Sequence, residues 1–313
     1  MVKAVSSTLE RVRLEINPFQ GYYFLYLLSP GYSLCSNPGL RLANAFGVMK
    51  LNQSSLLELP VVSAKSTWHR KVECGIYRLM KLAGLSSMVL GALVALVWSY
   101  SCLSFVARLK SKLRLRSGYT RKLFHVLTFT SAVFVQFLGG FWAVCVFGLM
   151  VSLVVGLAIL LGPGNRLFEA LAREQDRPHR TYYIVVSYFA TLIGGMASNL
   201  IFGPLAVMGY LVGGLGDAAG EPAGVRWGKH RYSVSNGVSK TFEGSFAVLA
   251  VSLIALSIGV AITPQLHFNS ESFIVLPAIA IVCTLVEAFS PRGWDNVPMQ
   301  IVPTVLSAML LSK

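Results

Sequence analysis

Charged side chains are scarce in this sequence. Only 13% of the 313 residues are Asp, Glu, Lys or Arg, whereas 54% are hydrophobic. Soluble domains carry about 25% charged residues, so the chain lacks the charge needed to cover a surface that faces water. This shortage excludes an ordinary soluble enzyme and a disordered tail. It predicts an all-α protein that crosses a membrane several times.

Cysteine is also rare. The five cysteines are Cys35, Cys74, Cys102, Cys145 and Cys283. No two of them are close enough in sequence for a CxxC metal or redox site, and the distribution excludes a disulfide scaffold. The last three lie inside apolar runs, where we interpret them as small core residues.

Acidic residues are fewer than basic ones. The 13 Asp and Glu stand against 27 Lys and Arg, which gives a formal net charge of +14. In membrane proteins Lys and Arg collect in the loops on one side simply to orient the helices. The basic excess therefore does not indicate nucleic-acid binding, and we expect no nucleic-acid partner.

Long apolar runs predict about seven to eight membrane-spanning helices. A helix that crosses a bilayer needs about 20 mostly apolar residues. The predicted spans are roughly 84–106, 123–138, 141–161, 182–202, 203–219, 243–263, 272–290 and 298–312. Connections that contain Lys or Arg alternate with connections that contain none, so all the charged loops fall on one face of the bilayer.

The first 80 residues form a different kind of segment. Residues 1–80 are weakly apolar and rich in Ser and Leu, and they lack a clear secretion signal. We expect an N-terminal extension, a candidate organelle-targeting segment, followed by one polytopic membrane domain over 81–313. The sequence leaves a bacterial inner membrane and a plastid or endoplasmic-reticulum membrane as alternatives.

Two of the few acids lie four residues apart at the end of the fifth predicted span. On a helix, this spacing places the carboxylates of Asp217 and Glu221 on one face. Paired carboxylates suit a hard divalent cation such as Mg²⁺, and ionisable residues beside a span are commonly functional. The alternative is a pair of solvated acids at the edge of a loop.

A basic, glycine-rich segment follows these acids. It contains Arg226 and Lys229, and it ends in Lys240-Thr241-Phe242-Glu243-Gly244-Ser245 where an apolar helix begins. A helix start and nearby cations favour a bound anion such as a phosphate. Glu243 has a simpler interpretation, stabilisation of the helix dipole, and the basic residues could serve topology alone.

Two more groups of polar residues belong to the same charged face. Arg121, Lys122 and His125 open the second predicted span within one turn, so that Lys122 and His125 can point together. Glu287 lies late in the seventh span and Asp295 lies in the turn that follows. Both acids are candidate site residues, although Asp295 could equally cap a helix.

Three stretches resemble the CTP-dependent polyprenol kinases, a family of phytol, farnesol and dolichol kinases related to phosphatidate cytidylyltransferases. They are Arg121-Lys122-Leu123-Phe124-His125, Gly216-Asp217-Ala218-Ala219-Gly220, and Lys240 to Ser245. The resemblance implies an integral membrane enzyme that moves a phosphoryl group from CTP to a membrane-dissolved isoprenoid alcohol. No Pro precedes Lys240, unlike in the cytidylyltransferases, and about three spans follow the motif, which favours a kinase.

We hypothesise roles for the candidate residues, with Asp217, Lys240 and Glu243 as the catalytic residues. Asp217 would hold Mg²⁺ with help from Glu221, and Glu243 would position the Lys240 segment or a metal-bound water. The remaining residues would contact nucleotide or substrate: Lys240, Arg226, Lys229, Arg121, Lys122, His125, Glu287 and Asp295. A cytidylyltransferase that makes a CDP-lipid and a non-enzymatic transporter or assembly protein remain the alternatives.

Overall fold

The computed structural model describes residues 65–234, 238–291 and 293–311. The chain divides into two compact units, residues 1–84 and 85–313, and the account below concerns the second. Most of the predicted extension over 1–80 lies outside the described residues. Its boundary and its targeting role therefore remain predictions.

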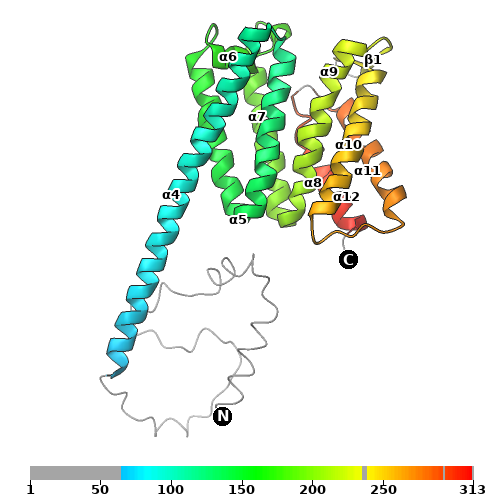
Figure 1. The fold of residues 1–313 in the computed structure, drawn as a ribbon. Coiled ribbons are helices and arrows are strands. Elements are labelled where there is room, and N and C mark those ends of the chain that lie inside the picture. Colours follow the sequence, from blue (N-terminus) through cyan, green and yellow to red (C-terminus); the bar gives the residue numbers. More distant parts are fainter. Residues whose placement is uncertain (1–64, 235–237, 292, 312–313) are drawn as a thin grey trace, which may run out of the picture. The chain divides into compact units, whose positions relative to one another are not determined.

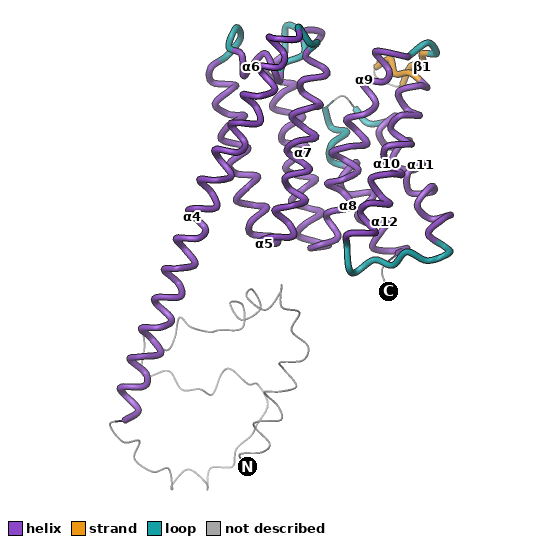
Figure 2. Tube along the Cα trace, in the orientation of Figure 1, coloured by secondary structure: helices purple, strands orange, loops and turns teal. Residues whose placement is uncertain are grey.

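The described residues form helices and a single two-stranded hairpin (Figures 1 and 2). The elements are α4 (Lys65–Leu113), α5 (Ser117–Leu161), α6 (Arg166–Leu171), η3 (Glu174–Asp176), α7 (Arg180–Phe202), η4 (Gly203–Leu205), α8 (Ala206–Leu211), η5 (Val212–Gly216), α9 (Asp217–Trp227), β1 (Arg231–Val234), β2 (Val238–Thr241), α10 (Phe242–Ile262), α11 (Ser272–Phe289) and α12 (Pro298–Leu311).

Within the part of the chain that the structure describes, five helical stretches are long and apolar enough to cross a bilayer, which is consistent with an integral membrane protein. They are Ser86–Leu113, Ser117–Leu161, Arg180–Trp227, Phe242–Ile262 and Ser272–Phe289. Two of these run to 45 and 48 residues, or about 70 Å, more than twice the apolar thickness of a bilayer. Gly140 and Gly203 interrupt them with φ angles of 61° and 55°. The mainly helical prediction agrees with this fold, and the count of seven to eight spans stays a prediction.

A short buried segment, α8 with η5, runs through the centre of the bundle. It packs against α5, α10 and α12, and Val207, Met208 and Val212 are fully buried. Two glycines in η5 admit neighbouring side chains: Gly213 faces Gln300 of α12, and Gly214 faces Phe129 of α5. The five residues of η5 form a π-helix, a wider turn that occurs often at functional sites. The next residue is Asp217, the first of α9.

Small residues bring α9 close to α10. The ridge Gly216, Gly220, Gly224 and Gly228 faces α10 and the residue that precedes it, and a Cβ at Gly220 would lie 2.8 Å from Val248 Cγ2. Glycine ridges of this kind let helix backbones approach closely in membranes. The ridge therefore serves helix packing.

The β1–β2 hairpin joins these two helices at one end of the bundle (Figure 1). Tyr232 is paired with Lys240 across the hairpin, and its hydroxyl lies 2.6 Å from Ser245 Oγ of α10. Thr241 caps α10, because its Oγ1 accepts a hydrogen bond from Gly244 N. These contacts fix the position from which the Lys240 side chain extends.

Candidate functional site

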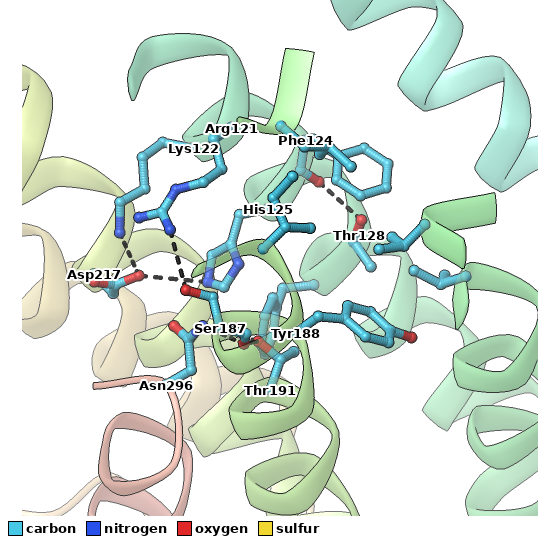
Figure 3. A pocket seen from close by; sticks show the side chains of 15 residues that line it. Arg121, Lys122, Phe124, His125, Thr128, Ser187, Tyr188, Thr191, Asp217 and Asn296 are labelled. Atoms are coloured by element: carbon cyan, nitrogen blue, oxygen red, sulfur yellow. Dashed lines mark hydrogen bonds and ion pairs between the residues drawn. The ribbon is translucent and has the colours of Figure 1, made fainter. Parts of the chain in front are cut away.

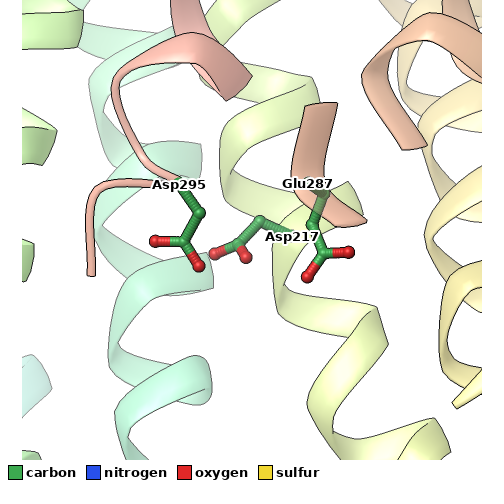
Figure 4. A group of neighbouring side chains, drawn as sticks. All are labelled: Asp217, Glu287 and Asp295. Carbon is green, nitrogen blue, oxygen red and sulfur yellow. The ribbon is translucent and has the colours of Figure 1, made fainter. Parts of the chain in front are cut away.

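Three carboxylates from separate parts of the sequence meet beside the start of α9 (Figure 4). They belong to Asp217, to Glu287 near the end of α11, and to Asp295 in the α11–α12 loop. One oxygen of each lies within 4.8 Å of the other two. Asp217 is buried and the other two are partly buried. We call this group the carboxylate cluster.

Two side chains on α5 approach Asp217. Lys122 Nζ lies 2.6 Å from Asp217 Oδ2, and both side chains are nearly inaccessible. His125 Nε2 lies 3.0 Å from the carbonyl oxygen of Gly213 in η5 and 3.5 Å from Asp217 Oδ2. The predicted convergence of Lys122 and His125 is therefore present, and its target is Asp217.

Lys240 contacts a second carboxylate of the cluster, that of Glu287. Its Nζ lies 2.7 Å from Glu287 Oε1 and also donates to the carbonyl oxygen of Glu287. Lys240 and Asp217 thus belong to one group of charges on the same side of the bundle, although 23 residues separate them in the sequence.

Asp295 is held in place by its neighbour in the loop. Asn296 Nδ2 donates to the carbonyl oxygen of Ser187 and to Thr191 Oγ1, both on α7. Burial, and then the negative charge of Asp217, raise the pKa of Asp295, against the opposing effect of nearby lysines and Arg173. Three carboxylates therefore share two paired lysines, Lys122 and Lys240.

An amphipathic pocket opens next to the cluster (Figure 3). Its polar end is formed by Arg121, Lys122, His125 and Asp217. The rest of its wall is mostly apolar and comes from both arms of α5 and from α7, including Phe129, Val151, Val155 and Ile184. A molecule with a polar head and a hydrocarbon tail matches this lining.

Glu221 does not join the carboxylate cluster. Its Oε2 lies 2.7 Å from Arg173 and 3.8 Å from Arg121. The spacing of four residues does put Asp217 and Glu221 on one side of α9, but arginines from α5 and from the α6–η3 connection hold Glu221 one turn away. Glu287 and Asp295 take the place beside Asp217 that the sequence assigned to Glu221.

The other predicted residues lie farther from the cluster. Glu243 accepts from His230 N at 3.2 Å and lies 2.8 Å from His230 Nδ1, so it ties the base of the hairpin to α10. Arg226 is exposed and lies over the ring of Trp227, with 5.7 Å to the centroid. Lys229 is exposed as well.

Sequence reasoning missed three residues of this region. Arg173, Ser187 and Asn296 line the pockets or hold the loops around the cluster. Arg173 is one of several loop arginines and nothing in its sequence context singles it out. Asn296 follows Asp295 in a turn, where an Asn is ordinarily interpreted as a turn or cap residue.

Comparison with known proteins gives one informative relative. The phytol kinase of Synechocystis sp. strain PCC 6803 is 33% identical to this chain over 105 residues, which are 34% of this chain and 43% of the relative. No family model matches the chain, and no solved structure matches it. The chain is therefore a distant relative of a phytol kinase over about a third of its length.

Proposed function

We propose that this protein is a membrane lipid kinase that transfers the γ-phosphoryl group of CTP, or of another nucleotide, to the hydroxyl of an isoprenoid alcohol such as phytol, farnesol or dolichol. The observation that carries the proposal is the contact between the carboxylate cluster and the amphipathic pocket. Likeness to a phytol kinase supports the choice of a prenol-type acceptor.

The carboxylate cluster fits Mg²⁺. Asp217, Glu287 and Asp295 offer three oxygens within 4.8 Å of one another, and carboxylate oxygen is the donor type that Mg²⁺ prefers. When bound there, Mg²⁺ would neutralise charge on the phosphates of the nucleotide.

The chain's own cations complete the phosphate side. Lys122 and Lys240 contact different carboxylates of the cluster, at 2.6 Å from Asp217 and 2.7 Å from Glu287. Phosphoryl transfer depends mainly on positioning and on cations around the equatorial oxygens. The two ammonium groups hold the transferred group between the donor and the acceptor hydroxyl.

The amphipathic pocket binds the acceptor alcohol. The hydrocarbon tail lies against the apolar side chains of α5 and α7, and the hydroxyl lies near His125 and Asp217. Because His125 Nε2 donates to the carbonyl oxygen of Gly213, Nδ1 is the nitrogen that can accept the hydroxyl proton. A new O–P bond forms to the alcohol, the bond to the β-phosphate oxygen breaks, and the nucleoside diphosphate leaves.

Label placement tests the function directly. Purified full-length protein in lipid nanodiscs is supplied with Mg²⁺ and CTP labelled at either the α- or the γ-phosphate, and with phytol, farnesol, dolichol or phosphatidate. We expect γ-label in an alcohol monophosphate, and none with the Asp217→Asn variant. Glu271→Gln, an exposed acid on the α10–α11 connection, is the matched control.

Two outcomes would reject the kinase. Incorporation of α-label into lipid would identify a cytidylyltransferase, which attacks the α-phosphate from the same kind of site. Absence of label from every lipid, with protein that is folded by its thermal unfolding transition, would favour a transporter or assembly protein.

A further inference from the structure

A second pocket is linked to the amphipathic pocket by the ion pair between Arg121 and Glu221. It is formed by the start of α5, by η3 and by α9, and its lining includes Arg116, Arg173 and Glu221. Seven of its ten lining residues are polar or charged. The roles proposed above leave it unassigned.

A series of ion pairs connects the two pockets. Arg121 lines the amphipathic pocket, where its guanidinium donates to Ser187 Oγ at 3.2 Å, and it also lies 3.8 Å from Glu221 Oε2. Glu221 in turn lies 2.7 Å from Arg173. Since Glu221 is one helical turn beyond Asp217, the second pocket lies one turn from the carboxylate cluster.

Glu221 sits where an external anion would bind. Its carboxylate lies between two guanidinium groups and against Gly118, where a Cβ would lie 2.5 Å from Glu221 Oε1. Guanidinium groups bind carboxylate and phosphate with the same forked geometry. The Nε atoms of both Arg121 and Arg173 are buried and make no hydrogen bond. Each arginine therefore has an Nε–H group that could donate to a larger anion.

We propose that this pocket binds the polyphosphate of the nucleotide donor, and that Glu221 is a resident anion that the phosphates displace from Arg121 and Arg173. The inference deepens the proposed kinase function and rests on it for the identity of the donor. It places the donor and the acceptor in separate pockets on either side of the Arg121–Glu221 pair. In-line transfer requires such opposite approaches to the reacting phosphorus.

The proposal predicts that one substitution in the pocket increases the affinity for the nucleotide. Glu221→Gln removes the competing charge, so the affinity for CTP and for inorganic tripolyphosphate should rise by about tenfold. Arg173→Ala should lower both affinities by at least as much. In the Arg173→Ala background, Glu221→Gln should have a much smaller effect, because the two residues act through one contact.

The experiment is isothermal titration of the full chain in nanodiscs with Mg²⁺ and each of the two probes. Glu271→Gln makes the same charge change on an exposed loop, so it reports the contribution of net charge alone. Thermal unfolding without ligand checks folding. Glu221→Gln should lower the midpoint, since it leaves two arginines without their partner, and each probe should restore it.

The possible results separate clearly. Tighter binding by Glu221→Gln but not by Glu271→Gln supports the proposal. Weaker binding by Glu221→Gln would show that Glu221 is a metal ligand, and unchanged binding would show a purely structural pair, so both overturn it. If the Glu221→Gln gain holds but labelled phosphate never reaches an alcohol, the kinase assignment fails while the anion site stands.

Discussion

The buried Lys122–Asp217 pair offers the sharpest test of the cluster's electrostatics. Lys122 Nζ lies 2.6 Å from Asp217 Oδ2, and the side chains are only 8% and 2% exposed. Replacing Lys122 with Met keeps the apolar stem and removes the charge. Asp217 would then face Glu287 and Asp295 with its direct cation gone.

Removal of one partner from a buried ion pair costs about 3–5 kcal/mol, because the other charge stays buried and unpaired. For a unit the size of residues 85–313, that cost corresponds to a fall of roughly 6–20 °C in Tm. Mg²⁺ should recover more of the Tm in Lys122→Met than in the wild type, because the variant's cluster carries one more uncompensated negative charge.

The assay is thermal unfolding in detergent, followed by tryptophan fluorescence with and without Mg²⁺. Lys112→Met is the matched control, since Lys112 is an exposed lysine near the end of α4 and should shift stability by at most about 0.5 kcal/mol. The double variant Lys122→Met/Asp217→Asn should be more stable than Lys122→Met alone. Wild-type Tm in Lys122→Met, or no recovery in the double variant, would refute the pairing.

Three further predictions concern the surroundings of the cluster. Two hydrogen bonds from Arg180 lower the pKa of Glu169 below its ordinary value of 4.5. The stabilisation of the fold by this carboxylate is therefore complete above pH 4.5 and is lost as the pH falls through the lowered pKa. Between neutral and acidic pH, Tm should drop less in Glu169→Gln than in the wild type, and parallel curves of Tm against pH would contradict this. Gly220→Ala should lower the free energy of unfolding by about 1–3 kcal/mol, because the added methyl group would push α9 away from α10. Gly91→Ala is the control and should not destabilise, because a Cβ there would meet nothing within 4 Å. Equal unfolding midpoints for the two variants would count against the close packing. Glu243→Gln should raise the KM for nucleotide with little change in kcat, because it loosens the hairpin; a large fall in kcat alone would instead place Glu243 at the reacting atoms.

The sequence predicts the helices well because apolar runs and basic loops report the bilayer directly. The runs at 123–138 and 141–161 correspond to the two arms of α5, and the break falls at Gly140 as the Gly139-Gly140 pair suggests. Those predictions depend only on local composition, which is why they need no knowledge of how the helices pack.

The site was predictable in part. Asp217, Lys122 and Lys240 carry the motifs of the resemblance, and they do converge. Glu221 was placed with Asp217 by spacing alone, whereas its direction depends on Arg173, which reaches it from a loop whose fold has no periodic signal.

The other two carboxylates of the cluster are harder to assign from the sequence. Glu287 and Asp295 come from an apolar helix end and from a loop, far from Asp217 in sequence. Their convergence is a tertiary property, fixed by Asn296 holding the α11–α12 loop to α7. Sequence spacing carries no information about that contact.

Direct titration of a divalent ion tests the central claim. Mn²⁺ can report the Mg²⁺ site by electron paramagnetic resonance on the purified chain in nanodiscs. The account predicts one tight site that is lost in Asp217→Asn, Glu287→Gln and Asp295→Asn and retained in Glu221→Gln. Full Mn²⁺ binding in the first three variants, or its loss only in Glu221→Gln, would contradict it.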